Sequence, residues 1–180
     1  LEEALLLDPD SIAANSFLSL YWQRKDRFGL ALVYLEVAAR LDPSNPAHQA
    51  ELGRLLASLG NFPEARQHYE NATRLAPRDP TYWRSLALFS IQSEFDVRQV
   101  ALQAARQAVV LDPKYPASLD TMAQVFLILD DPLSAGRFLQ RALQSDPAYA
   151  PAHLHLGWLY LLRDEAVLAR QELELAQSFS

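Results

Sequence analysis

The sequence predicts an all-α fold, built as an α-solenoid of antiparallel helix pairs. Three observations predict this fold: a phrase ending in proline recurs about every 34 residues, small residues recur in the same register, and each period carries two amphipathic helical patterns. Half of the 180 residues are apolar, which is enough for a substantial core.

The recurring phrase ends one helix of each period, because proline cannot continue a helix. Successive prolines of the phrase are separated by 34, 34, 36 and 34 residues. The phrase occurs as Leu7-Asp8-Pro9, Leu41-Asp42-Pro43, Leu75-Ala76-Pro77, Leu111-Asp112-Pro113 and Ser145-Asp146-Pro147. A second proline opens the following helix at Pro46 and Pro80, after a polar residue that we expect to cap it.

Small side chains form three columns in the same register. The columns are Ala4, Ala38, Ala72, Ala108, Ala142 and Ala176; Ala31, Ala65, Ala101, Ala135 and Ala169; and Ser19, Gly53, Ala87, Ala123 and Gly157. We expect them at helix crossings, where a larger side chain would push the helices apart. Replacing Gly53 with leucine is therefore expected to destabilise the fold by ~1–3 kcal/mol.

These residues resemble the tetratricopeptide repeat family, whose period is 34 residues and whose pattern combines Trp, Leu-Gly, Tyr, Ala and Pro at fixed positions. The third segment matches it with Leu52-Gly53, Gly60, Ala65, Tyr69 and Pro77, and the last with Leu156-Gly157 and Tyr160. Ala105 and Leu139 depart from it, because the family prefers an aromatic residue there. The resemblance covers nearly the whole chain and implies a right-handed superhelix of stacked pairs.

The register divides the chain into a leading half-repeat and five repeats, all in one solenoid. The boundaries are 1–11 for the half-repeat and 12–45, 46–79, 80–115, 116–149 and 150–180 for the repeats. The segment 80–115 carries two extra residues, expected in the turn near 93–97. Because the sequence starts inside a helical pattern and ends without a polar capping helix, we expect a fragment of a longer protein or ends covered by another copy.

The resemblance implies a binding surface on the inner face, lined by the first helix of each repeat. The residues predicted to bind protein there are Arg24, Arg54, Arg84, Leu88, Gln124, Leu127, Leu154, Trp158 and Leu161. One hypothesis is that the arginines grip an acidic or polar end of a ligand while Trp158 anchors an apolar end. The alternatives are that Arg54 pairs with Glu51 and that the residues around Trp158 pack on another helix or another copy.

Catalytic and metal-binding functions find no support. On a helix, His153 and His155 point to different faces, and Asp130-Asp131 is expected in a solvated turn. The sequence contains no cysteine, phosphate loop, nucleophile elbow or metal motif, so we predict no enzyme and no cofactor. The net charge of −6 argues against nucleic-acid binding, and no apolar run approaches the roughly 20 residues of a membrane span.

The predicted function is a scaffold or adaptor that binds a peptide or helix of another protein. The alternatives are a regulatory or substrate-recruiting arm of a larger enzyme, and a module that forms homodimers through uncapped ends. The sequence identifies neither the partner nor the pathway nor the compartment.

Overall fold

A computed structural model describes residues 2–180, and every helix and turn below lies in that range. The predicted half-repeat corresponds to helix α1 (Glu2–Leu7), while its first residue, Leu1, lies outside the described residues. The chain divides into two compact units, Leu1–Pro77 and Arg78–Ser180, which are described separately. Described residues form helices and turns and no β-strand, which confirms the predicted all-α fold.

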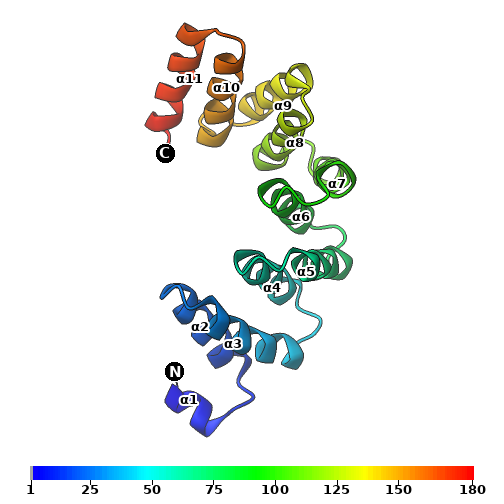
Figure 1. The fold of residues 1–180 in the computed structure, drawn as a ribbon, viewed down its shortest axis with the longest axis vertical. Helices are drawn as coiled ribbons and strands as arrows, with labels where there is room; N and C mark the ends of the chain where they lie inside the picture. The colour runs from blue at the N-terminus through cyan, green and yellow to red at the C-terminus, as the bar shows by residue number, and fades with distance from the viewer. Residues whose placement is uncertain (1) are drawn as a thin grey trace. The chain divides into compact units, whose positions relative to one another are not determined.

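The first unit contains α1 and two antiparallel helix pairs. The helices of these pairs are α2 (Ile12–Gln23), α3 (Phe28–Leu41), α4 (Pro46–Ser58) and α5 (Phe62–Leu75). In Figure 1, α2 packs along α3 and α4 along α5, with a short turn inside each pair. A core between α3 and α4 joins the two pairs. It buries Ala31, Leu35, Ala39, Leu52 and Leu55.

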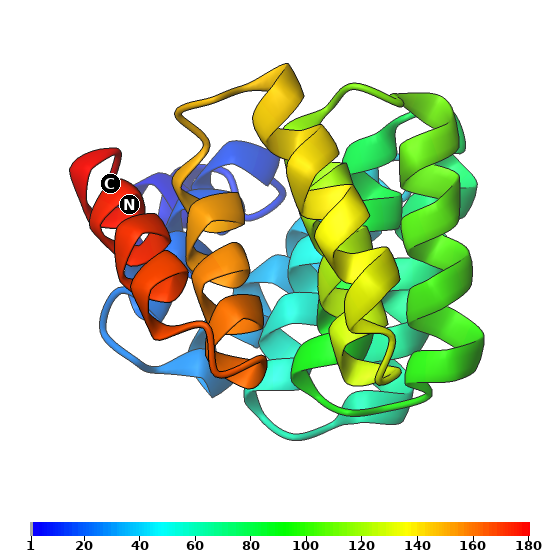
Figure 2. The same ribbon diagram turned by 90° about the horizontal axis from the view of Figure 1, so that it is seen from above.

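The second unit contains three pairs built in the same way. Its helices are α6 (Pro80–Gln92), the π-helical turn η1 (Val97–Ala101), α7 (Leu102–Leu111), α8 (Pro116–Ile128), α9 (Pro132–Ser145), α10 (Ala150–Leu162) and α11 (Ala166–Ser178). Figure 2 shows α10 and α11 side by side and joined by a tight turn. The core of this unit is shared by α8, α9 and α10. It buries Leu119, Ala123, Ala135, Leu139, Ala142, Ala152, Leu156 and Leu159.

The helix starts follow the predicted Asx-Pro signal. The Asn45 side chain accepts a hydrogen bond from the backbone N–H of Ala47 at 3.0 Å, and the Asp79 side chain accepts one from Thr81 at 2.8 Å. In both helices proline occupies the first turn, where a missing N–H leaves no bond unmade. The predicted capping at these two sites is confirmed.

The small-residue columns lie at the contacts between paired helices. From Ser19 to Ala176 every member of the three columns is buried. A Cβ atom added at Gly53 would lie 2.8 Å from Tyr69 Cδ2 and 3.0 Å from the carbonyl oxygen of Ala65, both on the partner helix α5. At Gly157 the added atom would lie 2.9 Å from Leu173 Cγ on α11. The backbones of α4 and α5, and those of α10 and α11, therefore approach so closely that a larger side chain would not fit between them, as the small-residue columns predict.

The turn inside each pair contains a residue in the left-handed region of backbone space. This residue is Asp26, Gly60, Glu94, Asp130 or Asp164, at successive spacings of 34, 34, 36 and 34 residues. In the longer turn of the 80–115 segment, Asp96 is left-handed as well, and η1 follows directly. The two extra residues are therefore accommodated by a second left-handed residue and a widened first helical turn.

Candidate protein-binding faces

In the first unit, the predicted inner-face arginines lie on or beside α2 and α4. Arg54 is exposed, and its guanidinium donates hydrogen bonds to Glu51 at 2.5 and 2.9 Å and to the side-chain oxygen of Gln23 on α2. Arg24 is exposed and caps the C-terminal end of α2. The alternative in which Arg54 pairs with Glu51 is thus the arrangement that the structure shows.

This pairing affects the ionisation of both groups. Burial raises the pKa of Glu51, but the hydrogen bonds and charge of Arg54 outweigh burial and leave that pKa below its ordinary value. The hydrogen bonds that Arg54 donates to Glu51 in turn raise the pKa of Arg54. The contact with Gln23, which lies one repeat earlier, makes the pair a link between α2 and α4 as well as a local ion pair.

In the second unit, α8 packs against both α6 and α10, and a polar cluster connects α8 with α10. Asp120 on α8 is 3% exposed. Its Oδ1 accepts a hydrogen bond from His155 Nδ1 on α10 at 2.6 Å, and its Oδ2 accepts one from Gln124 at 3.0 Å. Because Asp120 is buried, these two bonds replace the water that its carboxylate loses on folding.

Arg84 on α6 contributes to the same region. Its side chain is partly buried, and its Nε forms no hydrogen bond. Burial raises the pKa of Tyr149 to about 12, together with the charge of Asp120, while Arg84 partly opposes the increase. The charge of Arg84 therefore acts on side chains of its own unit. Leu88, one turn further along α6, is also partly buried.

Three of the other predicted residues of this unit form an exposed apolar surface on α10. Leu154, Trp158 and Leu161 are 47%, 62% and 50% exposed, and Leu162 beside them is 71% exposed. Their spacing of four, three and one residues puts them on one face of the helix. Leu127 on α8 is partly buried against the core, and Ile128 next to it is exposed. We call Leu154, Trp158, Leu161 and Leu162 the α10 face.

The α10 face stays at the surface because the opposite side of α10 is packed against the core. Ala152, Leu156 and Leu159 point into the core of the unit. His153 is buried between the carbonyl oxygen of Pro147 and the carboxylate of Glu172, at 2.9 and 2.6 Å. With its inner side packed against α8, α9 and α11, α10 exposes leucine and tryptophan on its remaining side.

A shallow apolar groove continues from this face between α10 and α11. It has a volume of ≈ 350 Å³, and Leu154 belongs to both surfaces. The groove is lined by Ala150, Pro151, Leu154, Leu173, Ala176, Gln177 and Ser180. This groove was not predicted from the sequence.

Side-chain pairs connect neighbouring repeats, and none of them was predicted from the sequence. Asp120 and His155 are 35 residues apart, Gln23 and Arg54 are 31 apart, and Ser16 and His48, whose side chains lie 3.4 Å apart, are separated by 32. All three separations lie near the repeat period. Complementary polar residues about one period apart on first helices are therefore a usable sequence signal for such pairs.

Among the helices of residues 2–180, none combines the length and the apolar character needed to span a bilayer.

Comparison with known proteins agrees with this architecture. Residues 24–88 match a family model described as tetratricopeptide repeat. Over these residues the chain is similar to the tetratricopeptide repeat family. The mouse protein tetratricopeptide repeat protein 21B is 37% identical over 68 residues, which is 38% of this chain and 5% of the mouse protein. The chain thus spans a small part of that relative.

Solved structures extend the likeness to nearly the whole chain. TTC0263, a thermophilic tetratricopeptide repeat protein of Thermus thermophilus, has a TM-score of 0.78 at 19% identity, covering 94% of this chain and 92% of its own. PilF of Pseudomonas aeruginosa has a TM-score of 0.77 at 20% identity, covering 94% and 76%. YrrB, described as having an unusual peptide-binding site, has a TM-score of 0.64 at 17% identity, covering 99% and 91%. At these identities the likeness shows the fold alone.

Tetratricopeptide repeat modules generally mediate protein–protein interactions, and their fold is typically a non-catalytic scaffold.

Proposed function

We propose that this chain is a protein-interaction module that binds an apolar segment of a partner protein on the α10 face. The observation that carries the proposal is the exposure of Trp158, at 62%, beside three exposed leucines on one side of a packed helix. A tryptophan surrounded by leucines can bury a large apolar area at a low cost in side-chain entropy. The family's usual role in protein binding supports the same function.

The position of the α10 face also favours binding. α10 is held by the core leucines on its inner side and by the His155–Asp120 bond to α8, so its exposed side chains project from a fixed helix. Preorganised contacts lose less entropy on binding than mobile ones. Gln124 and Leu127 on α8 lie on the neighbouring helix and extend the proposed site with one polar and one apolar side chain.

We expect the predicted inner-face arginines to contribute less to partner binding than the α10 face. Arg54 already donates to Glu51 and Gln23, and Arg84 is partly buried. A ligand carboxylate at Arg54 would have to displace Glu51, which removes much of the gain from a new ion pair. We therefore propose that apolar contacts dominate recognition and that Arg24, Arg54, Arg84 and Leu88 contribute little.

The test uses peptides selected from a displayed random library on the wild-type chain. Binding is then measured by fluorescence anisotropy with the wild type, Trp158→Ala and Leu161→Ala. We expect Trp158→Ala to weaken binding by roughly 30-fold, since a central tryptophan contributes about 2 kcal/mol or more at an interface. Val110→Ala on α7 is the matched control, because Val110 is 70% exposed and lies outside the α10 face.

Two results would contradict the proposal. One is equal affinity of the wild type and Trp158→Ala, provided that both unfold at the same denaturant concentration. The other is a wild-type mass near twice 20.3 kDa in light scattering that Trp158→Ala reduces to one copy, because the α10 face would then be covered by a second chain.

A further inference from the structure

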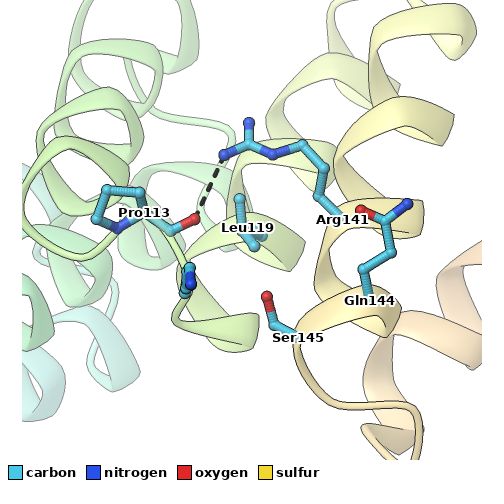
Figure 3. A pocket seen from close by; sticks show the side chains of 6 residues that line it. Pro113, Leu119, Arg141, Gln144 and Ser145 are labelled. Atoms are coloured by element: carbon cyan, nitrogen blue, oxygen red, sulfur yellow. Dashed lines mark hydrogen bonds between the residues drawn. The ribbon is translucent and has the colours of Figure 1, made fainter.

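A polar cleft lies at one edge of the second unit, away from the α10 face. It is formed by the turn between α7 and α8 and by the C-terminal end of α9, as Figure 3 shows. Its volume is ≈ 580 Å³, within the range of ordinary ligand sites. The lining residues are Pro113, Lys114, Leu119, Arg141, Gln144 and Ser145. None of them belongs to the α10 face.

The cleft coincides with a departure from the repeat pattern. The residue two positions before the phrase-ending proline is leucine at Leu41, Leu75 and Leu111, but it is serine at Ser145. Figure 3 shows the Ser145 side chain at the C-terminal end of α9, where it lines the cleft together with the fully buried Leu119. Loss of the leucine side chain leaves space at this point, and a hydroxyl group faces it.

Arg141 is held across the cleft by two contacts. Its guanidinium carbon lies 5.0 Å from the centre of the Phe138 ring, and its Nη2 donates a hydrogen bond to the carbonyl oxygen of Pro113 at 3.3 Å. Figure 3 shows the side chain reaching from α9 to the turn. Because arginine carries five N–H donors and only this hydrogen bond engages them, most of the guanidinium edge remains available.

The charge of the cleft is positive. Within residues 2–180, neither Arg141 nor Lys114 forms an ion pair. The carboxylates of Asp112 and Asp146, closest in sequence, are absent from the lining, and each accepts a backbone N–H in its own turn. Each polar side chain that lines the cleft is able to donate hydrogen bonds. This concentration of donors stands out in a chain with a net charge of −6.

Other repeats lack this combination of cations. In the register of Lys114 and Arg141, they carry one cation or none. The corresponding pairs are Ser44 with Asn71, Arg78 with Gln107, and Ala148 with Leu175. The cleft is therefore a feature of a single repeat and is not required by the helix packing that all repeats share.

We propose that this cleft binds a carboxylate-bearing segment of a partner protein. A glutamate or aspartate side chain lies between Arg141 and Lys114, because the planar guanidinium can donate two parallel hydrogen bonds to a carboxylate. Gln144 and Ser145 donate to the adjoining backbone carbonyls. An apolar neighbour of the acidic residue packs over Pro113. This site is independent of the α10 face, so an acidic stretch and an apolar stretch bind at different places.

The experiment titrates the isotope-labelled chain with a capped peptide of alternating glutamate and leucine. Two control titrations use the same peptide with glutamine in place of glutamate and inorganic phosphate alone. NMR shifts of backbone amides and arginine Nε–Hε groups report the site. We expect the glutamate peptide to shift Lys114, Arg141, Gln144 and Ser145, and the other two probes to shift them weakly. Equal shifts with the glutamine peptide, or saturation by phosphate without binding of the glutamate peptide, would overturn the proposal.

Variants taken from the other repeats make the test specific. Arg141→Gln introduces the residue of the preceding repeat, and Ser145→Leu restores the repeat leucine and fills the cleft. Arg141→Gln is expected to weaken binding of the glutamate peptide about tenfold or more, the usual effect of losing a charged hydrogen bond. Ser145→Leu is expected to weaken binding as well, because the leucine side chain occupies the space of the ligand. Arg137→Gln, one turn earlier on α9 and outside the cleft, is the matched control. Unchanged binding in Arg141→Gln, or an equal loss in Arg137→Gln, would refute the assignment.

Discussion

At the scale of single residues, the decisive property is how much room the backbone leaves for a side chain. Gly53 has Tyr69 and the Ala65 carbonyl within 3.0 Å of where a Cβ would lie, whereas Gly29 on α3 has no atom within 4 Å. Both glycines occupy helices with ordinary dihedral angles. Comparing substitutions at Gly53 and Gly29 therefore separates the effect of close packing from that of helix propensity.

Gly53→Ala is expected to destabilise the protein by ~1–3 kcal/mol, because the contact with a backbone carbonyl cannot be relieved by a rotamer change. Gly29→Ala serves as the control and should leave stability unchanged or raise it by up to ~1 kcal/mol through helix propensity. Denaturation in urea measures both. Similar losses for the two variants would mean that α4 and α5 do not approach as closely as described.

The phenols of Tyr69 and Tyr149 predict a pH dependence. Burial raises the pKa of each to about 12. The folded state therefore favours the neutral phenol, and stability that is present below the unfolded pKa near 10 is lost as the pH rises towards 12. These two phenols should ionise late in an ultraviolet absorbance titration of the folded protein. Tyr149→Phe should remove part of the late step; a titration in which all phenols ionise near 10 would contradict this.

At the scale of elements, each helix pair has at least one left-handed residue in its turn. Gly60 fills this place between α4 and α5 with a φ of 80°, and Asp130 fills it between α8 and α9 with a φ of 59°. Aspartate tolerates this conformation better than most residues, and glycine adopts it without strain. The turn is short, so the left-handed residue sets how α5 folds back on α4.

Gly60→Ala is expected to lower stability by about 1–2 kcal/mol, the cost of a left-handed alanine. A Cβ atom at Gly60 would meet nothing within 4 Å, so crowding does not contribute. Gly29→Ala is again the control, since it adds the same methyl group in open space at a helical φ. Thermal unfolding followed by circular dichroism distinguishes the two variants. An unaffected Gly60→Ala would show that the turn can rearrange at no cost.

At the scale of the whole molecule, the described core falls into separate parts. The buried cluster around Leu119 and Leu139 lies entirely within the second unit, and the cluster around Leu35 and Leu55 within the first. Repeat arrays owe their stability to contacts within each repeat and with its neighbours. The second unit also contains both proposed binding sites.

The segment Arg78–Ser180 is therefore expected to fold when produced alone. It should show helical circular dichroism and a cooperative melt, because its own helices supply the core that α8, α9 and α10 share. It should also bind the peptides selected on the α10 face as tightly as the whole chain. A segment that remains unfolded while the whole chain folds would show that its stability comes from residues before Arg78.

The sequence by itself determined the helix pairs of this protein. Its 34-residue register placed Ala65, Gly53 and their equivalents at helix crossings, and Asn45 and Asp79 at helix starts, because helical periodicity and capping are local properties of the chain. Only the tertiary structure decided that Arg54 bonds to Gln23, that His155 bonds to Asp120, and that Ser145 opens a cleft beneath Arg141. Those outcomes depend on distances between helices, which no residue encodes alone.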